Sequence, residues 1–181
     1  MEKSIVFAGF GGQDGLTAGL IVANVAMNAG KEVLWMPAYG GQMRGGKSYS
    51  LVKIDDVPIC HPDIEELDVL VAMNRPSLEG FSNFVKKGGL VLINSDTIGE
   101  DVPFEMEGVT AHRIPFATIA RSVNNGKGAN IAALGQLLKL TGMFDSELFK
   151  TGLLKYFEDK GKGAYAEKNA AAFDAGYNYQ I

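Results

Sequence analysis

The stretch SIVFAGFGGQDG, Ser4 to Gly15, decides the fold. Ser4 to Ala8 is a short apolar run that ends at glycine, which is typical of a buried strand. Leu16 to Asn28 follows with apolar residues at helical spacing, and Gly30 supplies a stop signal. Glu32 to Met36 is apolar again and predicts a second strand. A strand, a glycine turn, a helix and a strand form a βαβ unit, whose strands are parallel and whose crossover is right-handed.

The rest of the chain continues this alternation of strands and helices. Strands are expected over residues 50–54, 67–73, 90–94 and 109–114, and helices over 76–89, 117–123, 129–140, 146–159 and 164–177. The connection from Pro37 to Tyr49 has no helix and is only about a dozen residues long, so the strand after it should run antiparallel to the one before. We therefore expect an α/β fold: a single three-layer α/β/α domain over residues 1–181, Rossmann-like, with a mostly parallel but mixed sheet.

Composition and charge exclude several classes of protein. Hydrophobic residues make up 46% of the chain and charged residues 21%, which is the composition of a globular domain. The formal net charge of -4 argues against general nucleic-acid binding. The N-terminal stretch MEKSIVFAGF reaches glycine too soon for a signal peptide, and no apolar run approaches the ~18 residues that span a bilayer. We expect a cytoplasmic protein that binds neither nucleic acid nor membranes.

The cysteine content limits the redox chemistry of the chain. Its one cysteine, Cys60, cannot form an internal disulfide or hold an iron–sulfur cluster, which needs about four thiolates. Cys60 and His61 would make half a metal site, but the only other histidine is His112 and no acid-rich ligand spacing accompanies the pair. Ordinary packing is the better interpretation, and any redox centre must lie on another chain.

Two glycine-rich stretches match nucleotide-binding patterns. GQMRGGKS, Gly41 to Ser48, satisfies the phosphate-loop pattern, but a strand-like run follows it, whereas a phosphate loop enters a helix. Gly9 to Asp14 does lie between a strand and a helix, as in dinucleotide sites. There Asp14 replaces the third glycine, and Trp35 to Pro37 ends the second strand where a ribose-binding acid is expected. A dinucleotide or nucleotide enzyme is one alternative, and a turn that only packs helix on sheet is another.

Taken together, the loops resemble a known family. GFGGQ after the first strand is similar to the opening of the gamma subunit, or gamma domain, of 2-oxoacid:ferredoxin oxidoreductases, which act on pyruvate, 2-oxoglutarate or ketoisovalerate. The further motifs, in order, are VLWMPAYGGQMRGG, DVLVAMNRPSLEGF, VKKGGLVLINS, IPFATIA and ANIAALGQL. The tail KNAAAFDAGY also fits. Two departures fall in the loops: Asp14 stands where the family usually has glycine, and Gly41-Gln42 stands where Pro-Glu is common.

The resemblance implies a role within a larger enzyme. Such enzymes decarboxylate a 2-oxoacid oxidatively, join the acyl group to coenzyme A and pass two electrons to ferredoxin. Thiamine diphosphate with magnesium and the iron–sulfur clusters lie on alpha, beta and, in some, delta subunits. The gamma subunit packs against the thiamine-bearing chains and helps to receive coenzyme A. We therefore expect no catalytic residue, metal or cofactor held by this chain alone.

Arg44 is the charged residue most suited to a ligand. Glycines flank it, so its planar fork of donors stands among exposed backbone and suits a phosphate or a carboxylate. Coenzyme A supplies phosphates, a partner subunit could supply a carboxylate, and a structural arginine that ties down its own loop is the third interpretation.

Other candidates follow the predicted strands. The first glycine turn offers backbone N–H groups and an amide near a helix N-terminus, although its glycines would equally serve close packing. Tyr39 and Trp35 would stack on an adenine, fill an interface or, for Trp35, pack in the core. Asn74 lies at a carboxyl edge and is best interpreted as a helix cap, as is Asn130. The candidate ligand-binding residues are Gly9, Gly11, Gly12, Gln13, Tyr39, Gly40, Arg44, Gly45, Gly46 and Asn74.

The leading hypothesis is thus a gamma subunit that is inactive alone. A 2-oxoglutarate or branched-chain 2-oxoacid substrate is favoured over pyruvate for the complex. A subunit of an indolepyruvate oxidoreductase and a stand-alone dinucleotide or nucleotide enzyme are the alternatives. Ser48, Ser50 and His112 show no spacing that supports a nucleophile–base–acid set.

Overall fold

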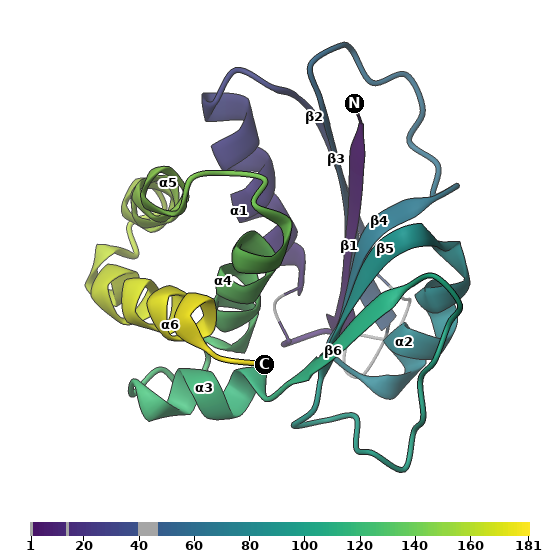
Figure 1. Ribbon diagram of the computed structural model, residues 1–181. Coiled ribbons are helices and arrows are strands. Elements are labelled where there is room, and N and C mark those ends of the chain that lie inside the picture. The colour runs from purple at the N-terminus through teal and green to yellow at the C-terminus, as the bar shows by residue number, and fades with distance from the viewer. Residues whose placement is uncertain (1, 14, 40–46) are drawn as a thin grey trace. The chain divides into compact units, whose positions relative to one another are not determined.

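The computed structural model describes residues 2–13, 15–39 and 47–181 (Figure 1). The chain divides into two compact units, Met1–Ile114 and Pro115–Ile181. The first contains the whole sheet and the second is helical. No helix in the described ranges has both the length and the apolar character needed to span a membrane.

The first unit is built on a six-stranded sheet with the order β2-β3-β1-β4-β5-β6. The strands are β1 (Lys3–Phe10), β2 (Glu32–Tyr39), β3 (Lys47–Asp55), β4 (Leu67–Ala72), β5 (Val85–Asn94) and β6 (Thr110–Ile114). β1, β4, β5 and β6 are parallel neighbours, whereas β3 is antiparallel to both β1 and β2. The predicted mixed sheet is confirmed, and the reversed strand is the one that follows the short connection after Tyr39.

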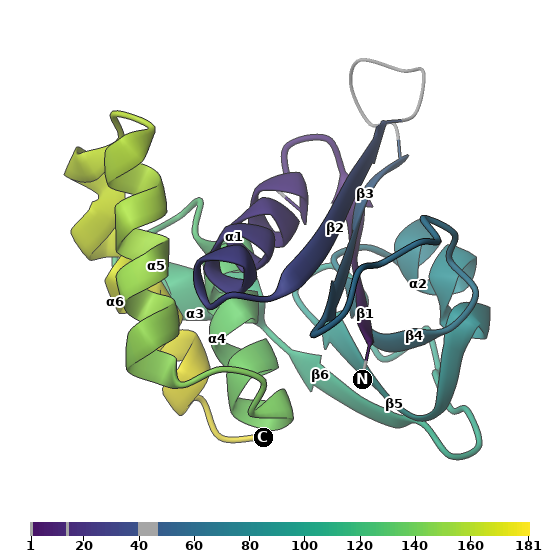
Figure 2. The same cartoon turned by 90° about the horizontal axis from the view of Figure 1, so that it is seen from above.

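Helices cover both faces of this sheet, which confirms the predicted α/β layers (Figures 1 and 2). α1 (Gly15–Asn28) packs against β1, β2 and β3 on one face, and α2 (Arg75–Phe81) packs against β4 and β1 on the other. The α2 face buries an apolar cluster that includes Val6, Leu51 and Leu70 of three strands, together with Leu78 of the helix.

α1 approaches the sheet closely because a glycine faces β3. A Cβ at Gly19 would lie 2.1 Å from Ser50 Oγ and 3.2 Å from a methyl group of Val52. The buried Ser50 hydroxyl instead donates a hydrogen bond to the carbonyl oxygen of Gly15, at 3.0 Å. Ser50 therefore connects the middle strand of the antiparallel part to the first turn of α1.

The predicted helix over residues 76–89 is wrong in its second half. α2 ends at Phe81, a 3-10 turn spans Ser82–Phe84, and β5 begins at Val85. Val85 pairs with Leu67 and Leu90 pairs with Val69, so the residues between Val85 and Leu90 loop out of the ladder as a bulge. Gly88 has φ +81°, which is why glycine stands in the bulge and not at a helix stop.

The connection from β5 to β6 contains no helix. Arg113 of β6 fixes this loop, because its guanidinium donates to the carbonyl oxygens of Ile98 (3.0 Å), Gly99 (3.1 Å) and Val102. Ile98 is 1% exposed and joins the apolar cluster on the α2 face. The Arg113 side chain and the apolar residues of the loop, Ile98 among them, thus hold a parallel crossover that would normally need a helix.

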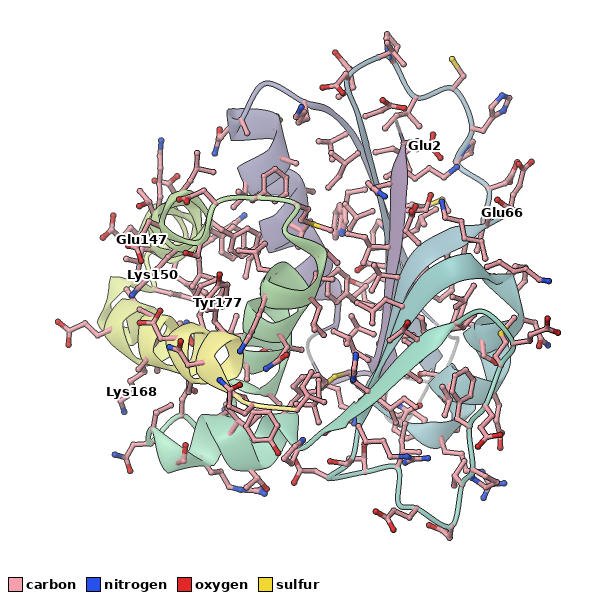
Figure 3. The ribbon with its side chains drawn as sticks, viewed as in Figure 1. Glu2, Glu66, Glu147, Lys150, Lys168 and Tyr177 are labelled. Carbon is pink, nitrogen blue, oxygen red and sulfur yellow. The ribbon has the colours of Figure 1, made fainter. Side chains whose placement is uncertain are left out.

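The second unit contains four α-helices and a 3-10 turn at Gly163–Tyr165, and the observed ends of the α-helices agree closely with the predicted ranges. They are α3 (Phe116–Ser122), α4 (Ala129–Thr141), α5 (Ser146–Asp159) and α6 (Ala166–Asn178). α4 and α6 cross with backbones in near contact, since a Cβ at Gly176 would lie 2.1 Å from the carbonyl oxygen of Ala132. Lys150 of α5, labelled in Figure 3, pairs with Asp174 of α6, and their Nζ and Oδ2 atoms lie 2.5 Å apart.

Candidate functional site

The candidate site lies where β1 and β4 end, side by side. Both strands are parallel, so their carboxyl ends meet at one edge of the sheet. The helix after β1 packs on one face of the sheet and the helix after β4 on the other. The two connections therefore diverge here, and such a switch point is where ligands bind in open α/β sheets.

The side-chain amide of Gln13 connects the two chain segments that meet at this switch point. Its Oε1 accepts from the backbone N–H of Phe10 (2.7 Å) and from Nδ2 of Asn74 (2.8 Å). Its Nε2 donates to the carbonyl oxygen of Met73, at 3.0 Å. Both lone pairs of Oε1 and one of the two N–H bonds are thus used within the chain. Gln13 and Asn74, two predicted site residues far apart in the sequence, are brought into direct contact.

Glycine stands at different positions of the turn for different structural reasons. A Cβ at Gly9 would lie 2.8 Å from Gln13 Oε1, so glycine leaves room for the amide to fold back. A Cβ at Gly11 or Gly12 would meet no described heavy atom within 4 Å, and both residues are exposed. Gly12 has φ +101°, which favours glycine for conformational reasons. The packing interpretation therefore fits Gly9 but neither Gly11 nor Gly12, whose backbone is open to a ligand or a neighbouring chain.

Asn74 is the N-cap of α2, as the sequence predicted. Its backbone is extended, and its Oδ1 accepts from the N–H of Ser77 at 3.0 Å. Only 4% of Asn74 is exposed, so its two polar atoms serve the helix and Gln13. The parallel interpretation of Asn130 is wrong: α4 begins at Ala129 with Gly128 as its cap, and Asn130 lies inside the first turn.

Thr97 belongs to the same edge and was missed from the sequence. Its hydroxyl lies 2.6 Å from the carbonyl oxygen of Met73, which also accepts from Gln13. The available signal was the polar run Asn94 to Thr97 directly after a buried strand, the same arrangement that drew attention to Asn74.

The remaining candidates lie at the ends of β2 and β3. Tyr39, the last residue of β2, is 74% exposed and presents its ring to solvent. Trp35 is half-buried in β2, and its indole Nε1 is buried with no acceptor among the described residues. Gly40, Arg44, Gly45 and Gly46 lie outside the described residues.

Three further groups considered for chemistry are Ser50, Cys60 and His61. The Ser50 hydroxyl is buried and committed to the carbonyl of Gly15. Cys60 and His61 lie exposed in the loop between β3 and β4. Within residues 2–13, 15–39 and 47–181, no group of three or more His, Cys, Asp or Glu side chains is placed to hold a metal ion.

The sequence of the chain matches a known protein family. The family described as pyruvate ferredoxin/flavodoxin oxidoreductase matches residues 4–179, nearly the full length of the sequence. The chain belongs to this family. The resemblance inferred from the collinear motifs is thereby confirmed.

Two curated members of the oxidoreductase family illustrate its range. The 2-oxoglutarate synthase subunit KorC of Methanocaldococcus jannaschii is 36% identical over 179 residues, 98% of this chain and 93% of KorC. The ketoisovalerate oxidoreductase subunit VorA of Methanothermobacter marburgensis is 37% identical over 180 residues, 98% of this chain. The chain spans 36% of the length of VorA.

Solved structures of family members have the same fold. The gamma subunit of a keto/oxoacid ferredoxin oxidoreductase from Geobacter sulfurreducens matches with a TM-score of 0.80 and 29% identity, over 97% of this chain and 96% of that one. A 2-oxoglutarate:ferredoxin oxidoreductase from Magnetococcus marinus, solved with 2-oxoglutarate, coenzyme A and succinyl-CoA, matches with a TM-score of 0.81 and 27% identity. That match covers 97% of this chain and 30% of the other. Within the family, the chain corresponds to the gamma subunit.

Three residues depart from the family pattern. Asp14, Gly41 and Gln42 all lie outside the described residues. The helices and strands that flank these positions are described: β1 ends at Phe10, α1 begins at Gly15, β2 ends at Tyr39 and β3 begins at Lys47. β3 begins at Lys47, the seventh residue of GQMRGGKS, so a strand and not a helix follows the glycines, which agrees with rejecting a phosphate loop.

Proposed function

We propose that this chain is the gamma subunit of a multisubunit 2-oxoacid:ferredoxin oxidoreductase and is inactive alone. The complex oxidises and decarboxylates a 2-oxoacid, forms the acyl-coenzyme A and reduces ferredoxin. The observation that carries the proposal is the end-to-end family match over residues 4–179 of a chain with one cysteine. A reaction that needs a thiamine carbanion and electron transfer then requires other chains.

The partner chains supply the cofactors in this proposal. Thiamine diphosphate, magnesium and iron–sulfur clusters belong to alpha and beta, or delta, subunits, and the complex is cytoplasmic. One thiol does not fit a cluster, which needs about four. VorA extends well beyond the region that this chain matches, since the match covers 36% of it.

The role of the gamma subunit is to complete the assembly and to receive coenzyme A. Support comes from the exposed backbone at Gly11 and Gly12 and from the exposed ring of Tyr39 at the end of β2. Backbone N–H groups bind anions, and an exposed aromatic ring stacks on a base. Arg44, with Gly40, Gly45 and Gly46 around it, would supply the fork of donors for a coenzyme A phosphate or a partner carboxylate.

The substrate is 2-oxoglutarate or a branched-chain 2-oxoacid. Support is the similarity to KorC and to VorA, whose names specify 2-oxoglutarate and ketoisovalerate. Indolepyruvate is the alternative substrate, and the turn between β1 and α1 leaves a dinucleotide enzyme as the alternative function. Against the dinucleotide enzyme, β2 ends in Pro37, Ala38 and Tyr39 without an acid for the ribose.

Anaerobic affinity purification of the tagged chain from its own cells tests the proposal. The co-purifying chains are identified, and dye reduction is assayed with each 2-oxoacid in the presence and absence of coenzyme A. Recovery of a thiamine-binding chain and of cluster-bearing chains, with turnover that depends on coenzyme A, is the expected result. A chain that emerges alone and binds NAD or ATP would refute it.

Arg44→Ala tests the role of the loop between β2 and β3. We expect a folded chain with weaker assembly or a raised KM for coenzyme A, and partial recovery in Arg44→Lys, which keeps the charge but not the fork. Lys87→Ala, which removes an 82% exposed charge from the β5 bulge, is the control. Equal turnover and equal coenzyme A dependence in Arg44→Ala and Lys87→Ala would show that the loop has neither role.

A further inference from the structure

The carbonyl oxygen of Met73 is a shared acceptor at the carboxyl edge of the sheet. It accepts from Gln13 Nε2 at 3.0 Å and from Thr97 Oγ1 at 2.6 Å. The N–H of the same residue donates to the carbonyl oxygen of Ala8 at 2.8 Å. One peptide segment after β4 is therefore bonded to the end of β1, to the turn after β1 and to the turn after β5.

Thr97 is itself held in a fixed place. Its N–H and that of Ile98 both donate to the carbonyl oxygen of Asn94, at 3.2 and 2.9 Å. Ile98 is 1% exposed and anchors this turn in the apolar cluster. The Thr97 hydroxyl also lies 3.2 Å from the Asn94 carbonyl oxygen, but it has one proton and the contact to Met73 is shorter.

The bonds of Gln13 fix the glycine turn. Its Oε1 holds the N–H of Phe10, and its own N–H donates to the carbonyl oxygen of Phe10 at 3.0 Å. Gly11 and Gly12, the two residues that this pair of bonds encloses, are the exposed ones with open space beside them. The direction of their backbone N–H groups thus depends on where Gln13 is held.

We infer that Thr97 is a positioning residue for the glycine turn Gly9–Gln13: its hydroxyl holds the Met73 carbonyl, and that carbonyl holds the Gln13 amide. The described hydrogen bonds of the Thr97 hydroxyl go to Met73 and Asn94, so its hold on the turn passes through Met73. The functional consequence rests on the proposed function, in which the turn contacts coenzyme A or a partner chain. In that setting Gln13 acts as the internal support of the site, and Gly11 and Gly12 present the contact.

The test compares three variants of the full chain. Thr97→Val removes the hydroxyl at constant shape, and Thr97→Ser keeps a hydroxyl. Thr151→Val is the matched control, because Thr151 of α5, in the helical unit, also donates to a backbone carbonyl, that of Glu147 at 2.8 Å. Backbone amide NMR spectra report the turn directly, and kcat and KM for coenzyme A are measured in the reconstituted complex.

We expect Thr97→Val to shift the amide signals of Gly11, Gly12 and Gln13, with Thr97→Ser close to the parent and Thr151→Val without effect on them. KM for coenzyme A rises about three- to tenfold, as for the loss of one hydrogen bond, at unchanged kcat. Unmoved glycine signals in Thr97→Val would overturn the inference whatever the kinetics. If the glycine amide signals shift in Thr97→Val while KM for coenzyme A and assembly stay unchanged, the positioning role of Thr97 is upheld. The proposal that the turn contacts coenzyme A or a partner chain is then refuted. Thr97→Ala repeats the test if Thr97→Val does not fold.

Discussion

Asn74 Nδ2 lies 2.8 Å from Gln13 Oε1, so the cap of α2 and the glycine turn after β1 share a hydrogen bond across the switch point of the sheet. The same asparagine accepts from Ser77 N–H at the first turn of α2. One side chain thereby ties two loops whose helices lie on opposite faces. This arrangement yields the first two predictions.

Asn74→Ala should lower the free energy of unfolding by about 1–2 kcal/mol, because it removes the helix cap and leaves Gln13 with one partner fewer. Asn74→Ser restores a cap but is too short for Gln13, so it should recover about half of that loss. Urea denaturation followed by circular dichroism measures both. Equal loss in the two variants would mean that the cap contributes nothing.

Gly9→Ala and Gly11→Ala form a matched pair within one turn. At Gly9 the new methyl group would lie 2.8 Å from Gln13 Oε1 and 3.2 Å from Met73 Cβ, so we expect a loss of about 1–3 kcal/mol. At Gly11 it meets no described atom within 4 Å, and the change should stay within about 0.5 kcal/mol. Thermal and urea unfolding of both variants check the difference, which would vanish if Gln13 were free to move aside.

Gly176→Ala should strongly destabilise the helical unit. Its Cβ would lie 2.1 Å from the carbonyl oxygen of Ala132, a backbone atom that cannot rotate away, so α4 and α6 must separate at a cost of about 3 kcal/mol or more. Gly80→Ala is the control, since that exposed glycine of α2 has open space and helix propensity favours alanine by about 1 kcal/mol. Opposite signs of the two changes in unfolding free energy are expected. A tolerated Gly176→Ala would mean that the two helices cross less closely.

Asp68 should make the first unit sensitive to acid. Burial alone would raise its pKa, but hydrogen bonds from Lys86, the Ser4 N–H and Lys3 outweigh it and hold the pKa below its ordinary value of 3.8. A lowered folded-state pKa stabilises the fold above the unfolded-state pKa, and this contribution is lost as the pH falls through the folded value.

Urea unfolding at a series of pH values from about 6 to 2 measures this contribution, because the loss spans the interval between the two pKa values. Asp68→Asn should be less stable than the parent near neutral pH and approach it in acid. Asp63→Asn, in the exposed loop before β4, is the control. A constant difference between Asp68→Asn and the parent across the range would exclude the linkage.

Arg113→Met should loosen the loop between β5 and β6. Three backbone carbonyls, those of Ile98, Gly99 and Val102, would lose their donor. We expect a destabilisation of about 1–3 kcal/mol and faster amide hydrogen exchange over the loop. Lys155→Met, on an exposed residue of α5, is the control. Unchanged exchange in residues 96–104 would show that the apolar anchor at Ile98 suffices.

The sequence predicted the features that depend on local interactions better than those that depend on contacts between distant residues. Apolar runs located the strands, and the short connection from Pro37 to Tyr49 was enough to reverse the strand after it, since a parallel crossover normally needs a longer connection with a helix. The helix predicted over 76–89 failed in its second half because Val85 pairs with Leu67, a contact between residues far apart in the sequence. Hydrophobic periodicity reports only local patterns and does not predict such a contact.

The sequence by itself determined the layered α/β fold, the glycine turn between β1 and α1, the cap at Asn74 and, through its ordered motifs, the family. The turn and the cap follow from residues close together in the chain, where glycine conformation and capping act locally, whereas the fold and the family follow from the order of such local patterns along the chain. Only the tertiary structure decided that Gln13 bonds to Asn74, that Thr97 and Gln13 share the Met73 carbonyl, and that Gly9 rather than Gly11 makes room for the amide. Those relationships arise because parallel pairing brings the carboxyl ends of β1, β4 and β5 to one edge, and strand order is fixed by burial across the whole sheet.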